Sequence, residues 1–565
     1  MGLLDILTII LLTIGVLCAG LAFSKRGKDM TSFFAAGGAV PWQMSGLSLF
    51  MGFHSAGTFV VWGSVAYMYG WVSITIQWTM AIAGLLVGCW IAPRWHRTGA
   101  LTVAEYINKR LGVSTQKIYT YLFLFISLFL TASFLYPVAK IVEVSTGIDL
   151  NLCIVLLGLF CILYVSVGGL WAVVSTDILQ CIILTAALII VIPLSIERVD
   201  GITSFISQTS ASFFNLTNAE YTLTFIIAFG IYNTIFLGGN WAYVQRYTCV
   251  RTERDSKKVG WLFAALYVVN PILWMLPPML YHACNSSLSV LESEGAYLMM
   301  CMDVLPKGIL GLMMGGMIFA TTSAMNSKLN IASGVITNDI FKRLRPKSSD
   351  KILMLTARLS TIGFGIASIL LALLIPHMGG VVNVVISLAA LTGVPLYLPI
   401  VWTLFSKRQT SRTVLTSMFL SLAINGFFKF ISPLLFNLSL DRTQEMVLGV
   451  VFPILCMTAF EVYLKTKEQT SGMYLSYKAW EKENQEKRDQ LSEQDILAAK
   501  RENKYSMRII GYGVIFIGLA ILILGLLAPS YKIFVASTGV GFILLGFILA
   551  KCGSLKPDMK DKKNI

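Results

Sequence analysis

The segment from residue 320 to residue 330 carries residue types that could bind a cation. Ala320, Ser323, Ser327 and Asn330 recur at spacings of three, four and three, so on an α-helix they share one face. Hard cations prefer oxygen ligands, and the hydroxyl and amide groups of this face therefore predict a sodium site. Small and hydroxylated residues also let two helices approach closely, so interhelical packing is the alternative interpretation.

Asp177, Lys328 and His54 are ionisable residues within apolar segments, where such groups are costly and are candidates for function. Lys328 adjoins the polar face, and it either extends to the membrane surface, pairs with a carboxylate such as Asp177, or occupies a cation site itself. Asp177 is either a helix-start carboxylate or a group linked to a cation. His54 either satisfies a backbone carbonyl or handles substrate or protons.

The elements that position these residues are membrane spans. The chain has 565 residues, of which 56% are hydrophobic and 13% charged, and its mean hydropathy is +0.74. Soluble domains carry about a quarter charged residues, so this composition excludes a soluble enzyme, a nucleic-acid binder and a disordered protein. The net charge of +15 is the excess expected from basic cytoplasmic loops.

A transmembrane helix needs about 20 apolar residues, and on that criterion about fifteen segments are candidates. They lie near residues 3–23, 42–67, 73–93, 118–140, 147–168, 172–195, 222–245, 260–282, 308–335, 355–375, 380–404, 413–432, 444–464, 509–528 and 532–551. Most Lys and Arg residues fall in alternate loops, which predicts an outside N-terminus and a cytoplasmic C-terminus in a plasma (inner) membrane.

Two of these spans look interrupted. The second carries Gly46, Gly52 and Gly57, and the seventh carries Gly230 and then Gly238–Asn240. Transporters use broken helices to bind solutes and ions, because backbone N–H and C=O groups without a helical partner are tolerated within a membrane only where they line a cavity. Each break opens a run of five spans, and since five is odd the second run is inverted relative to the first. The alternative is that glycine is simply common in membrane helices.

Outside the spans, the one sizeable polar block is 465–508, which is either a solvated cytoplasmic helix or a flexible linker. Cys284 and Cys301 share a predicted outside loop, where a disulfide between them is possible. The sequence carries neither a Walker loop nor a cluster of metal-ligating residues.

The chain resembles the sodium–solute symporter family, the relatives of sodium/glucose, sodium/proline and sodium/sialic acid transporters. The resemblance covers roughly residues 1–465, and its most specific part runs from Leu305–Gly308 to Asp339–Ile340. The other matching stretches are Phe33–Trp42, Ser55–Phe59, Gly168–Asp177 with Gln180, Gln245–Arg246, and Thr392–Pro395 leading to Lys407–Arg408. The resemblance implies an all-α membrane protein with a core of two inverted five-helix repeats, of the amino-acid/sodium symporter type.

The resemblance also implies sodium ligands. One sodium would be held by the carbonyls of Met51, His54 and Ala320 and by the hydroxyl of Ser323. A second hydroxyl usually follows that serine, but here the residue is Ala324. Some members hold a second sodium, for which the ligands here would be Asp177, Ser323 and Ser327. A lysine at the position of Lys328 departs from the family pattern and could replace a sodium ion with a tethered charge.

The substrate positions implied by the resemblance are Ser55, Thr58, Gln77, Asn240, Trp241 and Ser387. Ser55, Thr58 and Gln77 are more similar to the sialic acid transporters than to the sugar transporters. Those transporters use an arginine on the third core helix, and the fourth span here has none. A sugar or a sugar acid such as sialic acid is therefore the expected solute.

The expected function is sodium-coupled symport by alternating access, without catalysis, with sodium as the coupling ion and no other cofactor. The partners are the solute, sodium and membrane lipids, and nucleic acid is not one. A proton-coupled or sodium-independent carrier using Lys328 or Asp177 is the alternative, and a membrane receptor with a transporter fold is another. The predicted divisions are 1–41, 42–200 (first repeat), 201–410 (second repeat), 411–464 (accessory), 465–508 (cytoplasmic) and 509–565 (accessory, with a basic tail).

Overall fold

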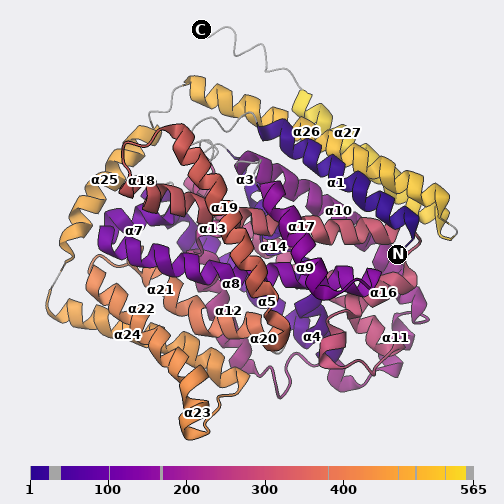
Figure 1. Cartoon of the computed structure of the whole chain (residues 1–565), viewed down its shortest axis with the longest axis horizontal. Coiled ribbons are helices and arrows are strands. Elements are labelled where there is room, and N and C mark those ends of the chain that lie inside the picture. Colours follow the sequence, from indigo (N-terminus) through magenta and orange to yellow (C-terminus); the bar gives the residue numbers. More distant parts are fainter. Residues whose placement is uncertain are drawn as a thin grey trace.

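The computed structural model describes residues 2–24, 40–100, 102–165, 170–378, 381–468, 470–489, 493–528 and 530–554. Helices make up nearly all of this part of the chain (Figure 1). Within it, the one β-type contact is an isolated bridge between Val40 and Val250. Most of Phe33–Trp42 and the start of Gly168–Asp177 lie outside the described residues.

The chain begins with α1 (Leu3–Ser24) and continues into the segment predicted as the first repeat. The elements of that segment are α3 (Trp42–Met51), η2 (Thr58–Trp62), α4 (Gly63–Tyr69), α5 (Val72–Leu86), η3 (Val87–Ile91), α6 (Ala92–Thr98), α7 (Val103–Leu111), α8 (Val113–Thr146), α9 (Leu150–Val165) and α10 (Leu170–Arg198). A loop with α11 (Ile202–Gln208) and η4 (Ala211–Phe214) follows.

The segment predicted as the second repeat comes next. It contains α12 (Leu223–Gly239), α13 (Trp241–Thr248), α14 (Glu253–Cys284), α15 (Val290–Ser293), α16 (Ala296–Val304), α17 (Ile309–Gly334), η5 (Val335–Phe341), α18 (Lys342–Leu344), α19 (Asp350–Ala372), η6 (Ile375–Met378), α20 (Val381–Leu388), η7 (Ala389–Gly393) and α21 (Val394–Thr403). The chain ends with α22 (Ser411–Gly426), η8 (Phe427–Ile431), α23 (Ser432–Phe436), α24 (Arg442–Thr466), α25 (Gly472–Asp489), α26 (Glu493–Leu527) and α27 (Lys532–Ser554).

Ten of the described helices are long and apolar enough to cross a membrane, or eleven if one bent pair is counted as a single span. Three further apolar helices are shorter: Leu3–Gly15, Leu150–Ile162 and Ile309–Thr322. The chain is therefore an all-helical integral membrane protein. The predicted count of fifteen spans is not confirmed by these lengths and compositions.

Both predicted breaks are present. The first lies between α3 and η2, where Met51 ends one helix and Thr58 begins the next helical turn. The second lies at Asn240, where α12 and α13 meet at an angle of 60°. The side-chain oxygen of Asn240 accepts a hydrogen bond of 3.0 Å from the amide of Ala242, which caps α13. Glycine in membrane helices therefore marked real interruptions at these two positions.

Small residues bring the core helices close together. A Cβ atom added at Gly260 on α14 would lie 2.6 Å from the Cα of Gly88, so these two backbones are in direct contact. The N-terminal helix α1 packs against α17 and α10. Its Asp5 is buried and accepts hydrogen bonds from the amides of Gly308 (2.6 Å) and Gly311 (3.1 Å) at the start of α17.

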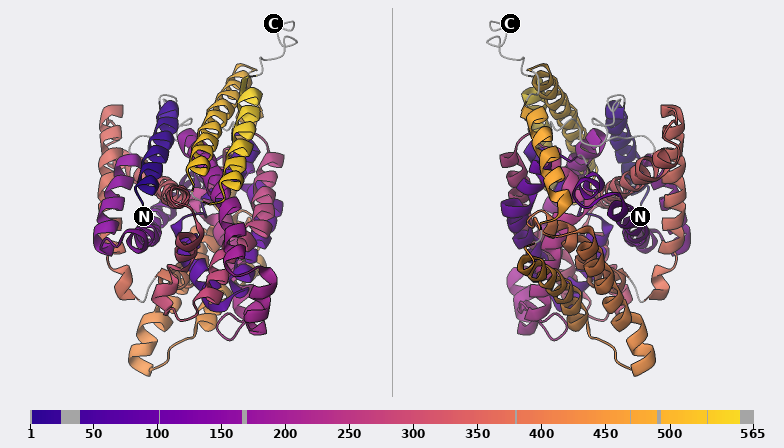
Figure 2. Two further views of the ribbon diagram at one scale, coloured as in Figure 1. Left: turned by 90° about the vertical axis from the view of Figure 1, so that its right-hand side faces the viewer. Right: turned by 90° about the vertical axis from the view of Figure 1, so that its left-hand side faces the viewer.

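The C-terminal hairpin of α26 and α27 packs beside α1 at one edge of the molecule (Figures 1 and 2). The predicted polar block forms α25 and the first part of α26, so its helical interpretation is confirmed in the described residues. Helix α26 runs without interruption across the predicted boundary at residue 508. Cys284 and Cys301 are both free thiols, and the possible disulfide between them is absent.

Candidate functional site

An internal cavity of about 150 Å³ lies where the two broken helices approach each other. The first break and η2 supply part of its wall, and α5, α8, α12, α13, α17, α20, η7 and α21 supply the rest. Its aromatic lining consists of Phe53, Trp62, Phe134, Phe229, Tyr232, Phe236, Tyr243 and Tyr397. Its other polar lining consists of Ser55, Thr58, Ser133, Asn233, Lys328 and Thr392. An apolar pocket with a few convergent polar groups is typical of a small-molecule site.

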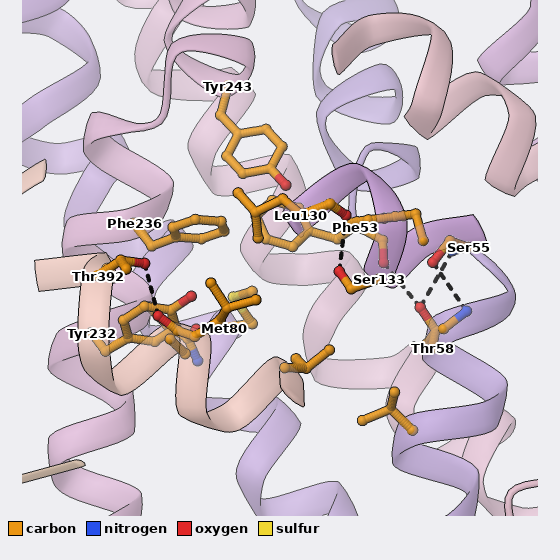
Figure 3. Close-up of a pocket in the computed structure, with 18 of the residues that line it drawn as sticks. Phe53, Ser55, Thr58, Met80, Leu130, Ser133, Tyr232, Phe236, Tyr243 and Thr392 are labelled. Carbon is orange, nitrogen blue, oxygen red and sulfur yellow. Dashed lines mark hydrogen bonds between the residues drawn. The ribbon is translucent and has the colours of Figure 1, made fainter. Parts of the chain in front are cut away.

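Ser55 and Thr58 line the cavity as the sequence predicted. Both hydroxyls also satisfy the interrupted backbone: Thr58 Oγ1 donates to the carbonyl of Phe53 (2.9 Å), and Ser55 Oγ accepts from the amide of Gly57 (3.1 Å). Figure 3 shows these two residues on one side of the cavity, with Tyr232 and Thr392 on the opposite side. The break therefore satisfies part of its own backbone and also forms a polar part of the cavity wall.

One end of the cavity is covered by stacked aromatic rings. The rings of Phe53 and Tyr243 are stacked with centroids 4.2 Å apart, which joins the two broken helices directly. Phe236 packs edge-on against Tyr243 at 5.6 Å (Figure 3). These rings belong to the first break, α12 and α13, so their contacts pack the two broken helices against each other at the cavity wall.

Lys328 projects into the same cavity from α17. Its ammonium lies 3.7 Å from the centroid of the Phe134 ring, a close cation–π contact. The predicted pairing with Asp177 is not what the structure shows, since the described contacts of Lys328 are with the cavity and this ring. Among the lining residues that the structure describes, Lys328 is the one charged group.

Of the residues predicted for the first sodium site, Met51 and His54 lie at the first break and Ala320 lies on α17. Met51, His54 and Ala320 are buried, while the side chains of Ser323 and Ser327 lie outside the described residues. The amide of Ala56 donates a hydrogen bond of 2.7 Å to the hydroxyl of Thr321, which joins the break to α17 next to Ala320. The site itself stays a prediction.

His54 is completely buried and its ring faces back toward α3. Its Nδ1 atom lies 2.8 Å from the carbonyl oxygen of Phe50, and its ring packs edge-on against Trp274 with centroids 3.7 Å apart. This geometry fits the interpretation in which the histidine satisfies a backbone carbonyl. The ring does not line the cavity.

Asp177 on α10 is buried beside α3, and its carboxylate contacts Ser48 and Arg246. It accepts a hydrogen bond of 2.5 Å from Ser48, and it lies 3.9 Å from the guanidinium of Arg246. Arg246 in turn donates from Nε to the same Ser48 hydroxyl at 2.9 Å. In this conformation Asp177 therefore has a fixed cation beside it, and its role as a sodium ligand stays a prediction.

The remaining predicted substrate residues do not line the cavity. Asn240 donates to the hydroxyl of Tyr397 (3.1 Å), which lines the cavity. Gln77 is buried without lining the cavity, and Trp241 stacks on Phe123 with centroids 4.3 Å apart. Ser387 accepts a hydrogen bond of 2.9 Å from Lys429 in a separate, smaller cavity.

The sequence predictions did not include several of the polar groups that line the cavity. Tyr232 and Asn233 on α12, Ser133 on α8 and Thr392 on η7 all face it. Each is a polar residue inside an apolar span, which was the signal available. That signal alone does not say which face of a helix points to the cavity.

The model of the sodium:solute symporter family matches residues 33–421. The sodium/sialic acid symporter SiaT of Proteus mirabilis is 29% identical over 374 residues, which cover 63% of this chain and 75% of that protein. The sodium/glucose cotransporter of Vibrio parahaemolyticus is 25% identical over 466 residues, which cover 76% of this chain and 84% of that protein.

Two solved structures share the fold. A sodium-coupled sialic acid symporter in a substrate-bound, outward-open state has a TM-score of 0.71 at 22% identity, over 83% of this chain and 98% of that one. A nucleobase-cation-symport-1 family transporter in a closed conformation has a TM-score of 0.50 at 13% identity, over 78% and 96% of the two chains. At these identities the likeness concerns the fold alone.

Proposed function

The chain belongs to the sodium:solute symporter family, and we propose on that basis that it carries a sugar or sugar acid into the cell together with sodium. The observation that carries this proposal is the cavity between the two broken helices, whose aromatic and hydroxyl groups suit a polyhydroxylated solute. The names of its relatives, a sialic acid symporter and a glucose cotransporter, support the same class of solute.

The proposed coupling site is the junction of the first break with α17. Its ligands would be the carbonyls of Met51, His54 and Ala320 with the hydroxyl of Ser323, and Asp177 with Ser327 would serve a second sodium. The hydrogen bond between Ala56 and Thr321 supports this placement, because it already joins the two elements. Sodium would strengthen the junction and complete the adjacent solute site, and by reciprocity the solute would tighten sodium binding equally.

The driving force is sufficient for a nutrient scavenger. One sodium ion moving down about 100 mV releases about 2.3 kcal/mol. A tenfold sodium gradient adds about 1.4 kcal/mol, and together they support roughly 500-fold accumulation of a neutral solute. Gln77, Asn240 and Trp241 would contribute to the solute site in another conformation of the transport cycle, whereas Ser387, which bonds to Lys429, would not.

We further propose the topology that the charge distribution predicts. The chain would cross the plasma (inner) membrane about fifteen times, in contact with its lipids, with the N-terminus outside and the C-terminus in the cytoplasm. The core would be two inverted repeats, 42–200 and 201–410, flanked by the accessory segments. Single cysteines introduced on either side of each helix, and labelled in intact cells, would test this orientation.

Sodium-22 binding to the purified protein tests the coupling ion. We expect saturable binding to the wild type that is lost in Ser323→Ala. Ser333→Ala is the matched control, because Ser333 is a buried hydroxyl on the same helix that donates to the carbonyl of Ala357. Binding that survives in Ser323→Ala would refute the proposed ligand, and no binding in the wild type would refute sodium coupling.

Uptake into proteoliposomes tests transport itself. We expect uptake of a radiolabelled sugar or sugar acid that depends on an inward sodium gradient. Uptake that responds to a proton gradient instead would favour the proton-coupled alternative. Solute binding without any uptake would favour a receptor.

A further inference from the structure

We propose that Lys328 is the carboxylate-binding group of the cavity, and that the solute is therefore a sugar acid carrying one negative charge rather than a neutral sugar. This inference rests on the proposed function, because it assigns the solute to the cavity between the broken helices. It narrows the solute class that the family resemblance leaves open.

The charge distribution of the cavity is the first argument. The lining residues that the structure describes include one ammonium and no carboxylate. A charge out of water requires a partner, and the ring of Phe134 supplies a weak one. A carboxylate on the solute would supply the full counter-charge, and the ammonium would return a charge-assisted hydrogen bond.

The hydrogen-bond donors of the wall are the second argument. Several hydroxyls already donate to backbone carbonyls: Thr58 to Phe53 (2.9 Å), Ser133 to Leu130 (2.8 Å) and Thr392 to Leu388 (2.8 Å). Their oxygen atoms can still accept hydrogen bonds from solute hydroxyls, but they have no proton left for a carboxylate. Ser55 and Tyr397, whose hydroxyls accept hydrogen bonds within the protein, can still donate to the solute, and the ammonium of Lys328 adds the one full positive charge among the described lining residues.

The wall hydroxyls and the ammonium of Lys328 would therefore bind different parts of the solute. The wall hydroxyls fit the hydroxyl groups of a sugar, and the ammonium fits an acid group on the same molecule. A carboxylate-binding arginine is absent from α8, the helix that the resemblance implies for it, but α8 supplies the ring on which the ammonium lies. The positive charge thus enters the cavity from α17 instead.

A tethered replacement for a bound sodium ion is the competing role for Lys328. That role requires protein oxygens around the ammonium. The described contact is instead an aromatic ring that itself lines the solute cavity. The carboxylate of Asp177 lies beside Arg246 and Ser48.

Matched pairs of solutes that differ only at the acid group test the proposal. The binding of N-acetylneuraminate and its methyl ester, and of glucuronate and glucose, would be measured on purified protein in sodium. The proteins would be the wild type, Lys328→Met and Lys328→Arg, with sodium-22 binding and the melting temperature measured on each to verify folding.

We expect the wild type to bind an acid about 10- to 100-fold more tightly than its neutral partner, the size expected for a charge-assisted hydrogen bond. Lys328→Met should bind both members of the pair alike, and Lys328→Arg should keep part of the preference. A wild type without a preference for the acid, or a preference that survives in Lys328→Met, would overturn the proposal. Equal weakening of acid and ester in Lys328→Met with altered sodium binding would also overturn it, in favour of the tethered charge.

The same measurements separate this inference from the proposed function. If no solute of the panel binds while sodium-22 binding is normal, the sugar-acid inference fails and sodium coupling stands. If neither sodium nor any solute binds to folded protein, the proposed function fails as well.

Discussion

The carboxylate of Asp177 and the guanidinium of Arg246 face each other across 3.9 Å, and the hydroxyl of Ser48 bonds to both. All three side chains are buried. This arrangement ties α3, α10 and α13 together below the first break. Removal of one charge would leave the other buried without its partner, which typically costs about 3–5 kcal/mol.

Asp177→Asn and Arg246→Gln should therefore each destabilise the protein strongly. The loss of unfolding free energy in the double variant should be smaller than the sum of the two single losses. Thermal unfolding in detergent measures this coupling as a double-mutant cycle. Ser48→Ala, which removes the shared hydroxyl but neither charge, should cost about 1–3 kcal/mol. Additive losses would show that the two charges do not interact.

Asp5 should contribute to the stability of α17 from a different helix. Its carboxylate accepts from the amides of Gly308 and Gly311 at the positive end of that helix. Asp5→Ala should lower the free energy of unfolding by about 1–2 kcal/mol, and Asp5→Asn should lower it by less. Asp303→Ala is the control, because Asp303 is exposed and should change stability by less than about 0.5 kcal/mol. Equal melting temperatures for Asp5→Ala and the wild type would contradict the capping role.

Ser387→Ala should affect stability rather than solute recognition. In the structure its hydroxyl accepts from Lys429, which also bonds to Glu445 at 2.7 and 2.9 Å. We expect the KM for uptake to stay within about twofold of wild type, and stability to fall by about 1 kcal/mol. Thr58→Val, which alters the cavity wall itself, should raise the KM more. A tenfold rise in KM for Ser387→Ala would instead support the sequence prediction that this serine binds the solute.

Glu294 should make stability depend on pH. It lies in the loop before α16, where its carboxylate accepts from the amide of Val381 (3.2 Å) and from the hydroxyl of Tyr136 (3.5 Å). Burial raises the pKa of Glu294 above its usual value of 4.5, although the Val381 amide opposes this shift. The folded protein therefore holds this proton more strongly than the unfolded chain does, and its stabilising effect is lost as the pH rises through the raised pKa.

Melting temperatures between about pH 5 and pH 7 test this sign. The wild type should lose stability more steeply with rising pH than Glu294→Gln, which carries no proton to lose. Glu292→Gln is a nearby control, since Glu292 is exposed and caps α15. Parallel curves for the wild type and Glu294→Gln would show that this carboxylate does not control the pH dependence.

The sequence predicted the helical class and the position of both breaks, because glycine and polar residues in an apolar span are local signals. Ser55 and Thr58 were predicted through the family resemblance, and both line the cavity at or next to the first break. The resemblance implied that Ser387 binds the solute, and in this structure its hydroxyl accepts a hydrogen bond from Lys429.

Tertiary contacts could not be derived in the same way. The sequence left Lys328 with three possible environments, and its actual neighbour, Phe134, is an apolar residue on a helix far away in the chain. The pairing of Asp177 with Arg246 also joins distant segments. Spacing identifies the residues that share a face, but the rotation of one helix against another decides what that face meets.

A positive charge fixed in the cavity has a consequence for the transport stoichiometry. A monoanion that enters with one sodium ion moves no net charge, so the membrane voltage adds nothing and a tenfold sodium gradient supports only about tenfold accumulation. With two sodium ions, one net charge moves inward, and the gradient and the voltage together supply about 5 kcal/mol, enough for several thousand-fold accumulation. If Lys328 selects an acid, accumulation beyond about tenfold therefore depends on the second sodium, and the measured charge per solute molecule would then be one.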